Sequence, residues 1–132
     1  MAAKKPLKAL EAALRRKALA YPEAHEDFPW GERVVKVWGK VFIFMRVDAG
    51  EFGLSVKLPA TGGMALLLPG TTPTAYGLAR SGWVSASFTA KSAPPLALLL
   101  EWLDESYRAV APKKVVLQLD DRRAARSRLR SA

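Results

Sequence analysis

Few residues in this sequence carry side chains that could do chemistry. His25 is the single histidine, and the 132 residues include no cysteine. A serine or cysteine nucleophile that needs a histidine base would therefore have to use His25. Its neighbours Glu26 and Asp27 are adjacent in the chain, so they cannot be assigned separate acid and base roles. The sequence predicts no catalytic residue and a protein that is not an enzyme.

Metal and phosphate chemistry have equally little support. One histidine and no cysteine leave only carboxylate sites, and no stretch has the acid spacing of a calcium loop. Gly62 and Gly63 lie in ATGGMALLL, which lacks the Gly-Lys-Ser/Thr ending of a phosphate-binding loop. We therefore predict no metal site and no cofactor.

Positive charge gathers at the two ends of the chain, whose formal net charge is +9. Residues 1–17 carry six cations and one acid, and residues 120–132 carry five arginines and two aspartates. The middle is therefore close to neutral. Basic ends on such a body indicate an anionic partner, such as DNA or another nucleic acid. Simple solubility, or the arginine-rich usage of a high-GC genome, is the alternative explanation.

The segment EDFPWGE, residues 26–32, is a second candidate site. Phe28 and Trp30 bracket Pro29, and Gly31 follows. One interpretation makes the two aromatic rings a ligand clamp. The other makes them plugs at the end of the first helix, with Pro29 and Gly31 shaping the turn into the first strand. We favour the structural interpretation.

Periodicity and turn residues predict the elements that position these candidates. A helix is expected to open at Pro6 and to stop before Pro22. Its apolar stripe is Leu7, Leu10, Leu14, Ala18 and Tyr21. The runs RVVKVW, VFIFMRV and FGLSVKL then predict three strands, joined by turns at Gly39-Lys40 and Ala49-Gly50.

Two tight hairpins would assign every residue of these strands to one of two faces, because side chains alternate along a strand. The predicted core face holds Val34, Lys36, Trp38, Val41, Ile43, Met45, Val47, Phe52, Leu54, Val56 and Leu58. The predicted outer face holds Arg33, Val35, Val37, Phe42, Phe44, Arg46, Gly53, Ser55 and Lys57. The outer face is mixed, with cations and aromatic rings but no acid.

The second half of the chain predicts further elements. Residues 60–68 are expected to form a short helix, and a short strand is expected near Tyr76. WVSASFT, residues 83–89, alternates as a strand with Trp83 on the outer face.

A long helix is predicted next. Ser92 is its expected N-cap, with Pro94 and Pro95 in the first turn, and it ends at Pro112. Residues 115–120 predict an edge strand, and residues 120–132 predict a frayed basic tail or a marginal helix. The element order is α-β(3)-α-β(1–2)-α. It predicts an α+β fold of two layers, with helices packed on one face of an antiparallel sheet.

The outer sheet face is the predicted binding surface. Aromatic rings on an open sheet can stack on bases, and nearby cations can neutralise phosphates. The candidate residues are Arg33, Phe42, Phe44, Arg46, Lys57 and Trp83. Two alternatives stay open. The face is covered by residues 115–132 or by a second subunit of a homodimer, with no nucleic-acid role, or it binds a small anionic ligand.

Several motifs in combination resemble the MmcQ/YjbR family. They are YPEAHEDFPWGE, VVKVWGKVFIFM, LSVKLPA, a strand led by tryptophan, and LDESYRAVAPKK. The resemblance covers roughly residues 7 to 114 and implies a small α/β fold of the CyaY-like or secretion-chaperone-like kind. It also implies DNA binding, since the family is described as binding DNA through a double wing. Many members carry a cysteine just before the proline of the first motif; here that stretch reads ALAYPE, so a thiol role is absent.

The resemblance also sets the domain boundaries. We expect residues 1–114 to form the family domain and residues 115–132 to form a basic extension. The first residues lack an uninterrupted apolar stretch, and no apolar run approaches the ~20 residues of a membrane span. The sequence therefore predicts a cytoplasmic protein with no membrane partner.

Overall fold

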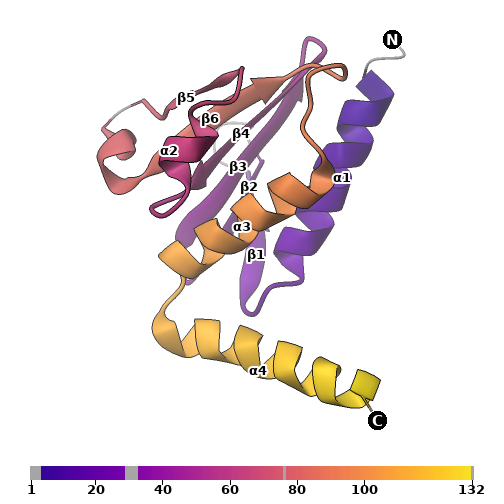
Figure 1. The fold of residues 1–132 in the computed structure, drawn as a ribbon, viewed down its shortest axis with the longest axis vertical. Helices are drawn as coiled ribbons and strands as arrows, with labels where there is room; N and C mark the ends of the chain where they lie inside the picture. Colours follow the sequence, from indigo (N-terminus) through magenta and orange to yellow (C-terminus); the bar gives the residue numbers. More distant parts are fainter. Residues whose placement is uncertain (1–3, 29–32, 76, 132) are drawn as a thin grey trace.

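The computed structural model describes residues 4–28, 33–75 and 77–131. Its elements are α1 (Lys4–Leu19), β1 (Ala24–Asp27), β2 (Arg33–Val37), β3 (Lys40–Asp48), β4 (Glu51–Lys57), α2 (Gly62–Ala65), β5 (Thr71–Pro73), the 3-10 helix η2 (Leu78–Ser81), β6 (Trp83–Phe88), α3 (Leu96–Val110) and α4 (Lys113–Ser131). The strands form a six-stranded antiparallel sheet in the order β1-β2-β3-β4-β6-β5 (Figure 1).

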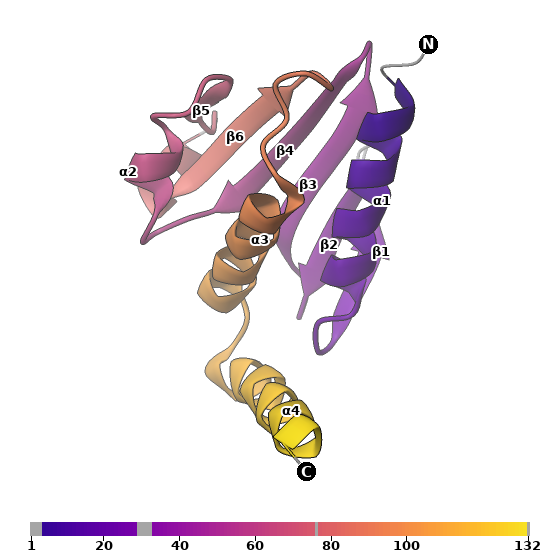
Figure 2. The ribbon, with the colours of Figure 1, turned by 45° about the vertical axis from the view of Figure 1, so that its right-hand side comes forward.

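Two helices cover one face of this sheet. Figure 2 shows α1 and α3 lying next to each other over the strands. The predicted stripe of α1 is confirmed, because Leu7, Leu14 and Ala18 are buried in the core that the helices share with the sheet. The α+β class, with helices packed on one face of an antiparallel sheet, is likewise confirmed.

Strand β1 was not predicted, because its sequence was interpreted as a connector. The four residues Ala24–Asp27 read AHED and contain no β-branched or aromatic residue. They nevertheless pair with β2, with Ala24 opposite Val37 and Asp27 opposite Val34. Pairing partners and packing, rather than intrinsic propensity, decide the conformation of such a strand.

The two central hairpins differ in how well the sequence predicted them. In the β3–β4 hairpin Val47 faces Phe52, as predicted. Its turn residues Ala49 and Gly50 both have positive φ, which is the conformation that two-residue hairpin turns require. The predicted Gly39-Lys40 turn of the β2–β3 hairpin is wrong, since Trp38 and Gly39 form the turn.

A β-bulge in the β2–β3 pair overturns part of the predicted face assignment. Lys36 lies opposite Val41, but Val35 lies opposite Ile43, so Phe42 is an extra residue on β3. An extra residue changes the alternation on that side of the bulge. Val35 consequently belongs to the core, and Phe42 is 0% exposed beneath the helices.

A buried hydroxyl bridges the strands next to this bulge. Ile43 opposite Val56 is the last regular pair between β3 and β4. Just beyond it, Ser106 of α3 donates a hydrogen bond to the carbonyl of Phe42 and accepts one from the amide of Lys57. The serine thereby satisfies two backbone groups that the sheet leaves unpaired there, as buried polar groups require.

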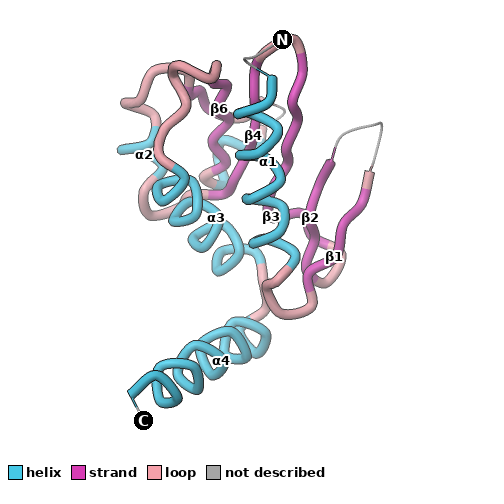
Figure 3. The backbone as a smooth tube through the Cα atoms, turned by 90° about the vertical axis from the view of Figure 1, so that its right-hand side faces the viewer, coloured by secondary structure: helices cyan, strands magenta, loops and turns pink. Residues whose placement is uncertain are grey.

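The end of the chain also differs from the prediction. Pro95 is the N-cap of α3, so the proline pair precedes the helix, and Ser92 instead bonds with Thr89. Residues 115–120 form part of α4 rather than an edge strand. Figure 3 shows α4 leaving the end of α3 at an angle, with its last turns extending away from the sheet.

Candidate nucleic-acid interface

Four of the six predicted binding residues share the outer face of the sheet. Cross-strand pairing puts Phe44 in one row with Ser55 and Ser85, and Lys57 in another with Trp83. Arg46 lies on the same face, opposite Gly53. The rings of Phe44 and Trp83 meet edge to face, with 5.6 Å between their centroids.

The other two predicted residues, Phe42 and Arg33, are on the opposite face, so their predicted placement is wrong. Phe42 packs edge to face against Tyr107 of α3, with 5.2 Å between centroids. Arg33 lies opposite Met45 and donates a hydrogen bond of 3.2 Å to Glu11 of α1. Both errors have one cause, because the bulge at Phe42 shifts the register between the strands.

The remaining aromatic residues do not form an open stacking surface. Trp83 is only 8% exposed, and Phe44 is partly buried against it. A base needs an accessible ring face to stack on. The outer face therefore lacks the flat aromatic platform on which the prediction depended, and homodimerisation through this face stays a prediction.

The EDFPWGE segment is described only in part. Phe28 is 54% exposed, with the Arg33 guanidinium 5.2 Å from the centroid of its ring, so it is not a core plug. Pro29, Trp30 and Gly31 lie outside the described residues. Their predicted structural role stays a prediction.

The outer face is hollowed rather than flat. A groove of about 520 Å³ lies over β3, β4 and β6, and its other wall is formed by Thr72, Thr74, Ala75 and Leu78. Its floor includes Phe44, Arg46 and Gly53. We call this feature the sheet groove.

A second feature is the way in which α4 attaches to the domain. Val115 and Leu119 in its first turns are buried in the core. Next to them Asp104 of α3 accepts hydrogen bonds of 2.8 Å from the Tyr21 hydroxyl and from Arg108 and Arg123.

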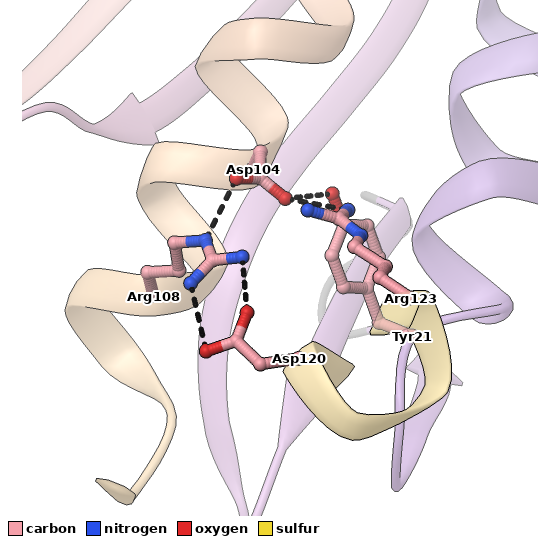
Figure 4. Close-up of polar contacts among 5 residues, drawn as sticks. All are labelled: Tyr21, Asp104, Arg108, Asp120 and Arg123. Atoms are coloured by element: carbon pink, nitrogen blue, oxygen red, sulfur yellow. Dashed lines mark hydrogen bonds and ion pairs between the residues drawn. The ribbon is translucent and has the colours of Figure 1, made fainter. Parts of the chain in front are cut away.

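The same contacts extend to a second aspartate. Arg108 also pairs with Asp120 of α4 at 2.8 Å, so the five residues drawn in Figure 4 join α3, α4 and the turn that follows α1. This network fixes the direction in which α4 leaves the domain.

The network sets the protonation states of its members. Partial burial alone would raise the pKa of Asp104, but hydrogen bonds from Arg108, Arg123 and Tyr21 outweigh it, and the pKa lies below its usual value. A hydrogen bond from Arg108 likewise lowers the pKa of Asp120. Burial, followed by the hydrogen bond to Asp104, raises the pKa of Tyr21. At neutral pH both aspartates are therefore ionised and Tyr21 is protonated.

The far half of α4 presents a row of cations. Arg122, Arg126 and Arg130 recur every four residues and so share one side of the helix. Arg126 and Arg130 form no ion pair with any described residue, whereas Arg123 is held by Asp104. Where this row meets the end of α1, Lys17, Arg122 and Arg126 line a shallow hollow.

Sequence reasoning found these cations but not their arrangement. The basic composition of residues 120–132 was evident, yet the helix that arrays them was only one of two alternatives. The buried apolar residues of α4 are Val115 and Leu119 alone among those described, because most of its later residues are charged and exposed. The docking partners Asp104 and Asp120 had no distinguishing sequence pattern.

The family comparison concerns residues that precede α4. The sequence model of the YjbR family matches residues 19–109, which is more than half of the chain. The chain belongs to the YjbR family. This YjbR chain is also similar to the crystal structure of the Deinococcus radiodurans protein DR2400, which has a DUF419 domain. The two share 27% identity with a TM-score of 0.59, over 74% of this chain and 75% of that one. No curated protein matches the chain.

The family match confirms the resemblance inferred from the sequence motifs, and it ends before α4 begins. No described helix is long and apolar enough to cross a membrane. Within residues 4–28, 33–75 and 77–131, no three histidine, cysteine or acidic side chains gather as a metal site would require. His25 is exposed on β1, at the edge of the sheet remote from β5.

Proposed function

We propose that this YjbR-family protein is a non-enzymatic module that binds nucleic acid through the basic surface of α4 and the adjoining end of α1. The observation that carries the proposal is the row of Arg122, Arg126 and Arg130 on a helix that extends away from the domain. A projecting helix can approach a phosphate backbone without a clash from the sheet. Its arginines bind phosphate oxygens in a fork geometry that lysine lacks.

Charge distribution supports the same surface. Lys17 lies beside Arg122 and Arg126, so α1 and α4 together offer cations on two sides of one hollow. Asp104, which contacts the lining residues Tyr21 and Arg123 of this hollow, is already paired with Arg108 and Arg123. An approaching phosphate would therefore meet a local excess of positive charge, which favours non-specific binding.

A binding role is also favoured over catalysis by the position of the only histidine. His25 stands exposed on an edge strand and lines neither the sheet groove nor the hollow beside α4. A general base has to lie within hydrogen-bonding reach of the group it deprotonates. Neither candidate surface can use His25 in that way.

The proposal predicts a salt-dependent affinity that depends on one helix face. Labelled single- and double-stranded DNA should bind at 50 mM salt and much more weakly at 200 mM, as counterion release requires. The double variant Arg126→Gln/Arg130→Gln should reduce the slope of log K against log salt by up to about 2, since each duplex phosphate contact contributes about 0.9. Fluorescence anisotropy measures both quantities.

A matched control distinguishes binding at one defined surface from an effect of net charge alone. Arg80 and Lys91 are exposed cations outside α1 and α4, and Arg80→Gln/Lys91→Gln removes the same charge. It should leave the slope nearly unchanged. An equal effect of the two double variants would contradict an α4 interface. Absence of salt-sensitive binding to either DNA at micromolar protein would contradict nucleic-acid binding itself.

A further inference from the structure

We propose that the sheet groove binds a small organic carboxylate whose body is apolar. The groove and the α4 surface are separate features, so this inference does not depend on nucleic-acid binding. Its occupant follows from four properties of the lining, which are the shape of the floor, the single charge, the hydrogen-bonding capacity of the hydroxyl groups, and the apolar walls.

The floor is open because a glycine lies in the middle of it. Gly53 of β4 stands between Arg46 of β3 and Ser87 of β6 in one cross-strand row. Its lack of a side chain leaves space between those two polar groups. The volume of about 520 Å³ lies within the roughly 300–1,000 Å³ range of small-molecule sites.

The charge of the lining selects an anion. Arg46 is the one charged side chain among the described residues that line the groove, and it is exposed. It forms no ion pair with any residue that the structure describes. A single guanidinium matches a carboxylate, which it can bind through two parallel hydrogen bonds. A phosphate dianion would call for more than one cation.

The hydroxyl groups provide a second donor. Ser85 shares hydrogen bonds with Ser55 at 2.7 Å and with Thr74 at 2.9 Å. Three hydroxyls contribute three protons, and these two bonds use two of them. The third proton has no acceptor among the described residues, so it is available to an acceptor atom of a bound molecule.

The rest of the lining is apolar and suits the body of the ligand. Phe44 forms part of the floor, and Ala75 and Leu78 lie on the opposite wall. Apolar walls with a few placed polar groups are typical of small-molecule sites. A ligand whose carboxylate binds Arg46 and whose hydrocarbon body lies between Phe44 and Leu78 would contact both the charged and the apolar parts of this lining.

The test titrates isotope-labelled protein with phenylacetate and, separately, with the neutral phenylacetamide. Phenylacetate should shift the amide resonances of Gly53, Ser85 and Ser87 in a saturable way. Arg46→Gln should weaken phenylacetate binding about tenfold and leave phenylacetamide unchanged. Lys57→Gln is the matched control, because Lys57 lies on the same face outside the groove lining, and it should change the affinity less than twofold.

A second variant blocks the site without disturbing the fold. A Cβ on Gly53 would lie 3.8 Å and 3.9 Å from its nearest neighbours, which is ordinary contact, and strands accept valine readily. Gly53→Val should therefore stay folded and lose phenylacetate binding while retaining any DNA binding. Equal shifts with both probes, no saturable shift at millimolar phenylacetate, or undiminished binding by Gly53→Val would each overturn the proposal.

Discussion

Phe42 and Phe44 are two positions apart on one strand, yet they belong to different environments. Regular alternation would put both rings on the same face. The bulge separates them, so that Phe42 is enclosed by Tyr21 and Tyr107 while Phe44 lies on the outer face with Trp83. One extra residue thus places the Phe42 ring in the core, in contact with Tyr21 and Tyr107.

The two phenylalanines should respond differently to truncation. Phe42→Ala removes a fully buried ring and should cost about 3–5 kcal/mol of unfolding free energy. Phe44→Ala should cost clearly less, because part of that ring is already in contact with solvent. Urea unfolding midpoints of the two variants and the parent measure the difference. Equal losses would contradict the assigned faces.

At the scale of elements, α4 is held by a small number of side chains. Two apolar residues, Val115 and Leu119, enter the core, and the charged network around Asp104 surrounds them. Because the network joins α3, α4 and the turn that follows α1, the protonation of one carboxylate affects how all of them pack.

This attachment should weaken in acid. The pKa of Asp104 is lower in the folded chain than the usual value of about 4, so its contribution to stability is complete above that value and is lost as pH falls below it. The melting temperature of the parent should exceed that of Asp104→Asn at pH 7, and the gap should shrink toward pH 3. Asp121→Asn, at an exposed acid of α4, should show no such gap. A gap that stays constant down to pH 3 would contradict the role of Asp104.

The same elements show what could be predicted from the sequence and why. The β3–β4 hairpin was predicted correctly because Ala49-Gly50 marks its turn and the flanking runs alternate regularly. The register of the β2–β3 pair could not be predicted, since a bulge depends on tertiary packing that single-residue patterns do not encode. In the same way, Arg46 and Lys57 were assigned correctly to the outer face. The groove could not be predicted, because it depends on where the fold places Thr72, Thr74, Ala75 and Leu78.

The whole molecule combines a domain with a helix that leaves it. The first turns of α4 help to complete the core through Val115, while its later turns are largely exposed and basic. Stability and nucleic-acid binding should therefore depend on different parts of one helix.

Two truncations test this division. Removal of residues 124–132 should change the free energy of unfolding by less than about 0.5 kcal/mol, as is usual for exposed positions. Removal of residues 113–132 should cost at least about 2 kcal/mol, because it uncovers the surface that Val115 and Leu119 bury. Chemical denaturation of both truncated proteins gives the values. A large loss from the shorter deletion would contradict the division.

The edges of the sheet limit how copies of this protein can meet. β5 is three residues long and ends at Pro73, which has no amide proton to offer, and β1 consists of four residues that include Glu26 and Asp27. Short strands, proline and charge are the features that discourage an edge from recruiting another strand. Growth into edge-to-edge fibrils is therefore disfavoured even at high concentration, and self-association would have to proceed through a face of the sheet or through α4.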